Sequence, residues 1–458
     1  MITPNRGRAQ QMRRGGSRRA LGGWHSVDPR RGSWVTTTFE MQADLRQLGF
    51  LLFVSALVAM FTRTLRLPYT AGLVLAGIGL YFGHVRLGLH LSKDLIFSVF
   101  LPPLVFGAAL YIHWSELKRD LSVVVTLATV GVLLSAVVTT VGMRYILSWD
   151  WGSSMLFGVL IAATDPVSVI ATFNEAGAKG RLRLLVESES LLNDGTAAVA
   201  FVAVLAVLAG ERIDALSLSA HLLLSIGGGV FIGAVVGYFF VFLASRTADR
   251  LVEITFTTLA AYGAFYLAER YRMSGVLAAL TAGLVIGNHA AQCTAVAGRE
   301  ALEVFWEYVA FVANSLIFLL IGAEEAQEHF SGLWVAVLAA IALVTLGRAV
   351  AVYPVCALFA RSRLAVDLRD QHVLFWGGLR GALALALALS LPADLPHRNH
   401  IIALTFAVVA FSVFAQGLTI TPLMRRLGEL PAADRAPQAA VSSVRSSGQV
   451  QHRSPTDD

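Results

Sequence analysis

Residues 187–196 read Glu-Ser-Glu-Ser-Leu-Leu-Asn-Asp-Gly-Thr at the start of an apolar run, and they combine side chains that could bind a cation. At 100° per residue, Ser190 and Asp194 share one helix face, while Glu189 and Asn193 share another about a quarter-turn away. A hydroxyl and a carboxylate supply the oxygens that hard cations such as Na+ prefer. We therefore expect Ser190 and Asp194 to face a cavity, with Glu189 and Asn193 facing neighbouring helices.

A second polar sequence, Ala-Thr-Asp-Pro-Val-Ser at 163–168, lies in the middle of another apolar run. Pro166 removes a backbone donor and clashes with the preceding turn, so the helix is expected to break there. At membrane depth such a break is tolerated only where the backbone faces protein or a water-filled cavity, and its carbonyls can then bind ions. Thr164 and Asp165 lie at this point, although Asp165 could instead serve only as a helix cap.

A buried Glu189 would need a positive partner, because an unpaired carboxylate inside a membrane is costly. Arg348 and Arg380 are the cations that lie deepest in apolar runs, and Arg348 is the favoured partner. The glycines around Arg380, at 377–381, predict a second interruption of a helix.

The composition predicts that the bilayer surrounds most of this chain. Hydrophobic residues make up 56% of the sequence and charged residues only 14%, which exceeds what a soluble core needs. An apolar run of about 18 residues is long enough to cross the hydrocarbon core as a helix. The expected spans lie near 45–62, 67–85, 94–113, 121–147, 152–174, 184–209, 218–244, 251–269, 273–290, 303–325, 332–360, 370–391 and 400–424. These thirteen ranges leave no room for a soluble catalytic domain, and no nucleophile and base are found within them, so an enzyme is not expected.

The lysines and arginines between these spans predict the orientation of the chain. The loops on one side of the membrane carry fifteen such residues and those on the other side seven. We therefore expect an inner-membrane protein whose C-terminus lies on the more basic, cytoplasmic side. Residues 1–40 hold eight Arg against Asp28 and Glu40, which accounts for the whole net charge of +6 and removes the case for nucleic-acid binding. Such a basic segment is disfavoured outside, so our hypothesis is that translation starts at Met41. The expected organisation is a tail at 1–44, a transmembrane domain at 45–424 and a short disordered cytoplasmic tail at 425–458.

Three strings, ATDPVSV, ESLLNDGTA and GGLRGALALAL, occur in this order, and together they resemble the cation:proton antiporter-1 family of bacterial sodium–proton antiporters. The resemblance covers essentially residues 45–424. It implies an all-α membrane protein of about thirteen helices in two inverted repeats, with the fifth and twelfth helices interrupted and crossing. It also implies a homodimer in which a core domain moves against a dimerisation domain.

The same resemblance implies roles for individual residues. Asp194 resembles the family's ion-binding aspartate, Ser190 a direct cation ligand, and Thr164 a residue that contributes its main-chain carbonyl, while Asp165 helps to shape the crossing. Asn193 resembles the variant associated with electroneutral, one-for-one exchange. Gly107 departs from the family, which usually has a glutamate there, and this departure bears on cation affinity.

The resulting prediction is an antiporter that exchanges Na+ or Li+ for H+ by competition at Asp194. It needs no cofactor beyond the ions that it transports. Two alternatives stay open at this point. The same fold could exchange K+ for H+, or the protein could be a membrane ion sensor that does not transport, although two interrupted helices argue against a sensor.

Overall fold

The computed structural model describes residues 29–65, 68–85, 91–178, 180–210, 215–247, 249–293, 296–326 and 332–429, and within these ranges every regular element is a helix. Internal contacts divide the chain into two units, Met1–Arg46 and Gln47–Asp458. Helix α1 (Pro29–Leu65) begins in the first unit and continues in the second. The helix therefore begins well before residue 45, where the first span is expected to start, because extending an existing helix costs far less than starting one. The basic residues before Pro29 and the tail beyond Glu429 lie outside the described residues.

The second unit contains all the remaining helices, three of which are short π-helical segments within longer apolar helices. In its first part, the bounds are α2 (Tyr69–Phe82), η1 (Leu95–Phe100), α3 (Leu101–Leu110), α4 (Trp114–Thr126), η2 (Leu127–Gly131), α5 (Val132–Ile146), α6 (Trp151–Leu160), α7 (Pro166–Ala176) and α8 (Arg181–Leu208). In its second part, they are α9 (Ala215–Ala244), α10 (Arg250–Arg270), α11 (Gly275–Cys293), α12 (Val296–Glu325), α13 (Trp334–Phe359), α14 (Leu368–Trp376), α15 (Ala382–Leu389), α16 (Arg398–Phe411), η3 (Ser412–Gln416) and α17 (Gly417–Leu427).

Two of the expected spans are interrupted where the sequence predicts breaks. Residues 161–165 separate α6 from α7, which begins at Pro166, because proline is well tolerated in the first turn of a helix and is disfavoured further inside it. Residues 377–381 separate α14 from α15, and three of these five residues are glycine. Both interruptions lie between short helices, none longer than 11 residues.

Each of the thirteen expected ranges contains helix, but the helices differ in length. Among the described residues, eight helices are long and apolar enough to cross a membrane alone. Shorter apolar helices occupy Tyr69–Phe82, Leu95–Leu110, Trp151–Leu160 and Gly275–His289. The polytopic all-helical architecture is therefore confirmed, whereas the count of thirteen stays a prediction.

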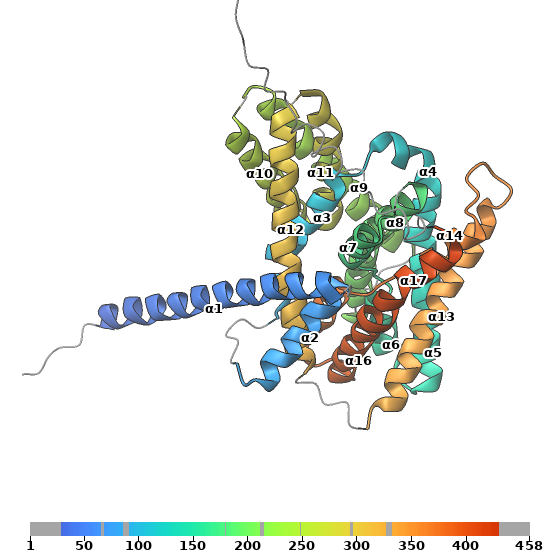
Figure 1. The fold of residues 1–458 in the computed structure, drawn as a ribbon. Coiled ribbons are helices and arrows are strands. Elements are labelled where there is room, and N and C mark those ends of the chain that lie inside the picture. The colour runs from blue at the N-terminus through green and yellow to red at the C-terminus, as the bar shows by residue number, and fades with distance from the viewer. Residues whose placement is uncertain are drawn as a thin grey trace, which may run out of the picture. The chain divides into compact units, whose positions relative to one another are not determined.

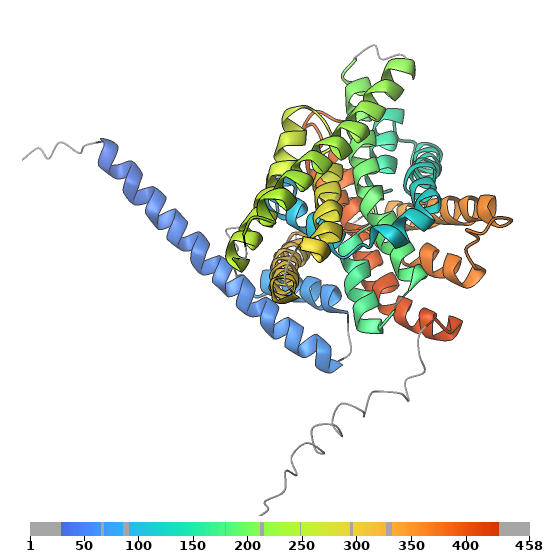
Figure 2. The same cartoon turned by 90° about the horizontal axis from the view of Figure 1, so that it is seen from above.

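The helices of the second unit form two groups (Figures 1 and 2). In one group, α11 packs against α3, α9 and α10, and α12 packs against α2. In the other, α5 packs against α6 and α13, while α8 contacts α4, α6 and α7. Helix α8 also contacts α9 and α11 of the first group, so it lies where the groups meet.

Candidate functional site

The two interruptions meet directly. The backbone N–H of Asp165, just before α7, donates a 2.7 Å hydrogen bond to the carbonyl of Leu379, between α14 and α15. Both residues are buried, at 8% and 2% exposure. Extended backbone from two distant parts of the chain is thus paired in the interior, where unpaired groups would be costly.

A small cavity lies at this meeting point. Its volume is about 20 Å³, and its polar lining includes Thr164, Asp165 and Asp194, with α3 and the start of α15 supplying apolar side chains. A cavity of this size holds about one water-sized particle. Three of the five predicted binding residues therefore border a space fit for one ion.

Asp194 is almost fully buried, at 2% exposure, and its Oδ1 accepts no hydrogen bond from the described residues. A buried carboxylate oxygen without a donor is expensive, and the cost disappears if a proton or a cation binds it. The geometry therefore permits two chemical roles for Asp194, as a proton carrier and as a cation ligand.

Ser190 and Asn193 are connected to the cavity through Thr164 and do not line it. The Thr164 hydroxyl donates to Ser190 Oγ at 3.1 Å, and the Asn193 amide donates to Thr164 Oγ1 at 3.1 Å. Asn193 Oδ1 is a second buried oxygen without a described donor. Our expectation that Ser190 faces the cavity beside Asp194 is therefore not met in this structure, because the Thr164 side chain is its contact.

Asp165 lies at the N-terminus of α7, and its carboxylate accepts a hydrogen bond from the Ser168 hydroxyl. A negative charge in this position is favoured by the partial positive charge of the helix start. The structure thus places Asp165 both at the start of α7 and in the cavity wall.

The structure brings Glu189 and Arg348 together across 159 positions of sequence. The guanidinium binds both carboxylate oxygens, at 2.7 Å and 2.9 Å, and both residues are buried, at 0% and 6% exposure. Arg348 also donates to the carbonyl of Leu374 near the end of α14. The pair therefore joins α8, α13 and the C-terminal end of a broken helix.

Arg380, the other cation that the sequence offered as a partner of Glu189, does not join this ion pair. Its guanidinium donates to the carbonyls of Ala162 and Ala163, at 2.6 Å and 2.8 Å, where α6 ends. No acidic partner of Arg380 is found among the described residues. The last carbonyls of a helix carry partial negative charge, so a buried cation can be satisfied there without an acid. Each interrupted helix thus has one buried arginine at the C-terminal end of its first half.

Two glycines allow these close approaches. A Cβ at Gly381 would lie 2.4 Å from Asp165 Oδ2, and a Cβ at Gly378 would lie 2.5 Å from Arg348 Nε. Real side chains do not approach so closely. The glycines of the second interruption are therefore needed for contact as well as for flexibility.

Gly107, the departure noted in the sequence, packs against Trp306 of α12. A Cβ at this position would meet the indole at 3.5 Å, an ordinary contact, but a longer side chain would need Trp306 to move. Trp306 is 1% exposed and donates to the Thr257 hydroxyl at 3.1 Å.

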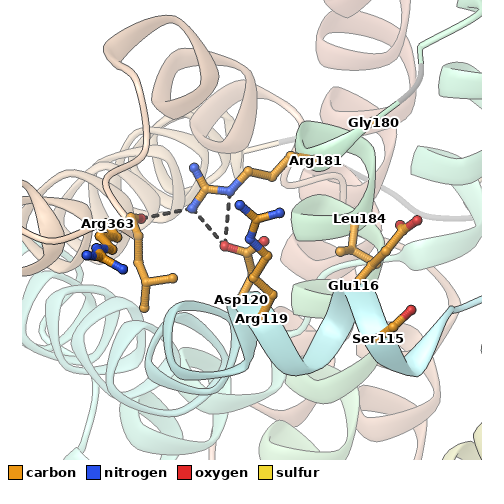
Figure 3. A pocket seen from close by; sticks show the side chains of 9 residues that line it. Ser115, Glu116, Arg119, Asp120, Gly180, Arg181, Leu184 and Arg363 are labelled. Atoms are coloured by element: carbon orange, nitrogen blue, oxygen red, sulfur yellow. Dashed lines mark hydrogen bonds and ion pairs between the residues drawn. The ribbon is translucent and has the colours of Figure 1, made fainter.

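A larger cavity, of about 430 Å³, lies where α4 and the start of α8 meet the loop after α13 (Figure 3). Arg181 donates to Asp120 at 2.7 Å and to the carbonyls of Leu364 and Ala365 at 2.9 Å and 2.7 Å. From the sequence, Arg181 is expected to be one of the fifteen charges in the loops. Nothing in the sequence alone pairs it with a buried aspartate 61 positions earlier.

A second ion pair that the sequence did not predict lies within α8, where Arg183 Nε is 2.5 Å from Glu187 Oε1. We had placed the start of this span near residue 184, but α8 begins at Arg181. The sequence does contain a signal for this pair, because residues of opposite charge four positions apart lie on one face of a helix.

Comparison with known proteins finds relatives over most of this chain. The sequence profile described as "Sodium/hydrogen exchanger, transmembrane" matches residues 50–426. The "Low-affinity Na(+)/H(+) antiporter NhaS1" of Synechocystis sp. is 37% identical, over 86% of this chain and 76% of its own length. The "Na(+)/H(+) antiporter NhaP" of Pseudomonas aeruginosa is 38% identical over 73% of this chain and 81% of its own.

A solved structure shows the same fold. The chain in the map of "the sodium proton antiporter MjNhaP1 from Methanocaldococcus jannaschii" superposes with a TM-score of 0.71, at 20% identity, over 86% of this chain and 99% of that one. A second structure of that protein, at pH 8, gives a TM-score of 0.65 at 19% identity.

Proposed function

This chain belongs to the sodium/hydrogen exchanger family, and from that premise we propose that it exchanges Na+ or Li+ for H+ across a membrane, with Asp194 binding each in turn. Several relatives, at 33–38% identity over most of the chain, are named Na+/H+ antiporters. Their names favour Na+ over K+ as the exchanged cation. The protein is thus a transporter and not a sensor.

The observation that carries the proposal is the environment of Asp194. Its buried Oδ1 has no described hydrogen-bond donor, and it borders a cavity with Thr164 and Asp165. Bulk water would normally satisfy a carboxylate, but Asp194 is only 2% exposed. A proton or a monovalent cation each neutralises the charge, so the site is stable with either one bound.

Competition between the two ions follows from the single carboxylate, because a protonated Asp194 no longer has the negative charge that binds a cation. About 20 Å³ leaves room for one particle of water size beside Asp194. A cation that enters must displace the proton, and a proton that returns must displace the cation. Movement of the loaded site in either direction then couples a proton gradient to cation extrusion.

The charge at the site supports electroneutral, one-for-one exchange. Asn193 is neutral where a second acid would add charge, and its amide is already used by Thr164. Glu189 is compensated by Arg348. One uncompensated carboxylate takes one monovalent ion, and a neutral site crosses a low-dielectric region at far lower cost than a charged one.

The remaining parts of the proposal concern placement. We place the protein in the inner membrane with its C-terminus in the cytoplasm, on the basis of the loop charges. We also propose a homodimer, in which the helix group that contains α8 and the two interrupted helices moves against the other group. Asn193, Ser190, Thr164 and Asp165 shape the site, while the Glu189–Arg348 pair and Arg380 hold its frame.

The test is cation-driven proton flux in vesicles that contain the purified protein. With a pH gradient imposed, Na+ and Li+ should each collapse it, while K+ should not. Asp194→Asn should abolish the response while its melting temperature and membrane insertion stay close to wild type. Asp94→Asn, a change of the same type at an exposed position, serves as the control. Retained flux in the Asp194→Asn variant would overturn the proposal.

A further inference from the structure

Helix α8 carries a stripe of four polar residues along one face. Arg183, Glu187, Ser190 and Asp194 are spaced at i, i+4, i+7 and i+11, so at 100° per residue they lie within about 60° of one another. The stripe runs from the first turn of the helix to the proposed ion site. Polar residues repeated along one face of an apolar helix indicate a route for something polar.

Glu187 is the member of this stripe that has no role so far. It is 9% exposed, and its only described side-chain partner is Arg183 Nε, 2.5 Å from Oε1. Seven residues of helix place it about 10 Å along the axis from Asp194. The Arg183 side chain is more exposed than that of Glu187, at 33% against 11%, so the pair lies between the solvated end of α8 and the buried site.

Stabilisation of the helix does not account for this pair. The orientation with the cation first and the acid four residues later is the less favourable one within a helix. Arg183 also lies in the first turn, where the helix dipole disfavours positive charge. Burying a carboxylate adds a desolvation cost that an exposed pair would avoid.

The charges at this end of α8 explain why a carboxylate would be needed. Arg181 and Arg183 lie in the first turn of the helix, and the adjacent 430 Å³ cavity is lined by Arg119, Arg181 and Arg363 against Glu116 and Asp120, which leaves an excess of positive charge (Figure 3). A monovalent cation that approaches Asp194 from this end meets positive potential. Glu187 is a buried negative charge on the same helix face as Asp194, beyond those arginines.

We propose that Glu187 is a gating carboxylate on the cation route between the basic end of α8 and Asp194. In the closed arrangement Arg183 neutralises it. A partly hydrated monovalent cation that enters from this end takes the place of the guanidinium and then passes to Asp194. The inference rests on the proposed exchange function, and it assigns a residue that touches the ion only in transit.

By the same loop charges, the basic start of α8 lies on the cytoplasmic side. Two vesicle preparations from an exchanger-deficient bacterium therefore test the gate. Everted vesicles expose the cytoplasmic face, and right-side-out vesicles expose the opposite face. Glu187→Gln should raise the Na+ concentration for half-maximal flux about fivefold in everted vesicles, because one charge near the route is lost. The value in right-side-out vesicles should stay unchanged. Arg183→Gln should lower the value in everted vesicles, because Glu187 is then free.

Glu187→Asp keeps the charge and should behave closer to wild type than Glu187→Gln, and Glu307→Gln, a change at an exposed acid on α12, should change neither preparation. Equal changes in both vesicle types, or none, would overturn the gate while leaving exchange itself intact. If Glu187→Gln does not fold, Arg183→Gln is the deciding variant. An unchanged Na+ concentration for half-maximal flux in its everted vesicles would then contradict the gate. Absence of Na+-driven flux in the unmodified protein would instead contradict the proposed function.

Discussion

The backbone N–H of Asp165 and the carbonyl of Leu379 form a 2.7 Å hydrogen bond that joins the two interrupted helices of this protein. Around this bond, three of the four half-helix ends lie beside a side chain of opposite charge. The first halves, α6 and α14, end near the buried arginines Arg380 and Arg348, which donate to their final carbonyls. One of the second halves, α7, begins beside the Asp165 carboxylate. The charges of helix ends are thus compensated locally, which leaves Asp194 as the buried acid that awaits an ion.

Exchange should be insensitive to membrane potential. One carboxylate, Asp194, carries one proton or one monovalent cation, and neutral Asn193 adds no charge, so no net charge crosses per cycle. The measurement is the initial rate of Na+-driven proton flux in vesicles with the potential clamped at zero and then set to about 100 mV by an ionophore. A rate that rises steeply with potential would contradict one-for-one exchange.

The Glu189–Arg348 pair should behave as a structural unit. Arg348→Met leaves a buried carboxylate unpaired, and Glu189→Gln leaves a buried guanidinium without its acid, so each should lower the free energy of unfolding by about 3–5 kcal/mol. The double variant should lose much less than the sum, because neither charge remains. Thermal or denaturant unfolding in detergent measures all three. Additive losses would mean that the two residues act independently.

Gly381→Ala should disrupt the site through Asp165. The added Cβ would lie 2.4 Å from Oδ2 and 2.6 Å from the Asp165 Cβ, so the clash involves the root of that side chain and cannot be relieved by its tip alone. We expect transport to fall at least tenfold, with a lower melting temperature. The matched control is Gly263→Ala on α10, where a Cβ meets nothing within 4 Å. A fully active Gly381→Ala variant would show that the interruption is wider than the structure indicates.

Asp150, outside the spans at the start of α6, should contribute stability that depends on pH. Burial raises its pKa, but hydrogen bonds from Ser153 and the positive charge of His397 outweigh this effect and hold the pKa below its ordinary value. A group with a lowered folded pKa stabilises the protein above its unfolded pKa, about 3.9, and loses that contribution as the pH falls through the folded value.

Asp150→Asn keeps a helix cap and removes only the charge. Its melting temperature should therefore lie below that of wild type at pH 7, and the difference should be smaller at pH 3. An equal difference at both pH values would show that the side chain acts by shape and not by charge.

The sequence alone determined the class of this protein and the places where its helices break. Apolar runs long enough to span a bilayer must be helical there, because no water is present to pair with the backbone. Proline is disfavoured in the interior of a helix, and α7 begins at Pro166. The spacing of Ser190 and Asp194 also placed them on one helix face, since the period of an α-helix is fixed.

The tertiary structure alone decided which residues meet across the fold. Arg348 and Arg380 both lie in apolar runs, so local pattern could not tell that one binds Glu189 and the other the end of α6. Ser190 shares a helix face with Asp194, yet its hydroxyl contacts Thr164 from another segment and does not line the cavity. The partner of a buried polar group depends on where neighbouring helices place their donors and acceptors. The order of residues along one helix does not specify that arrangement.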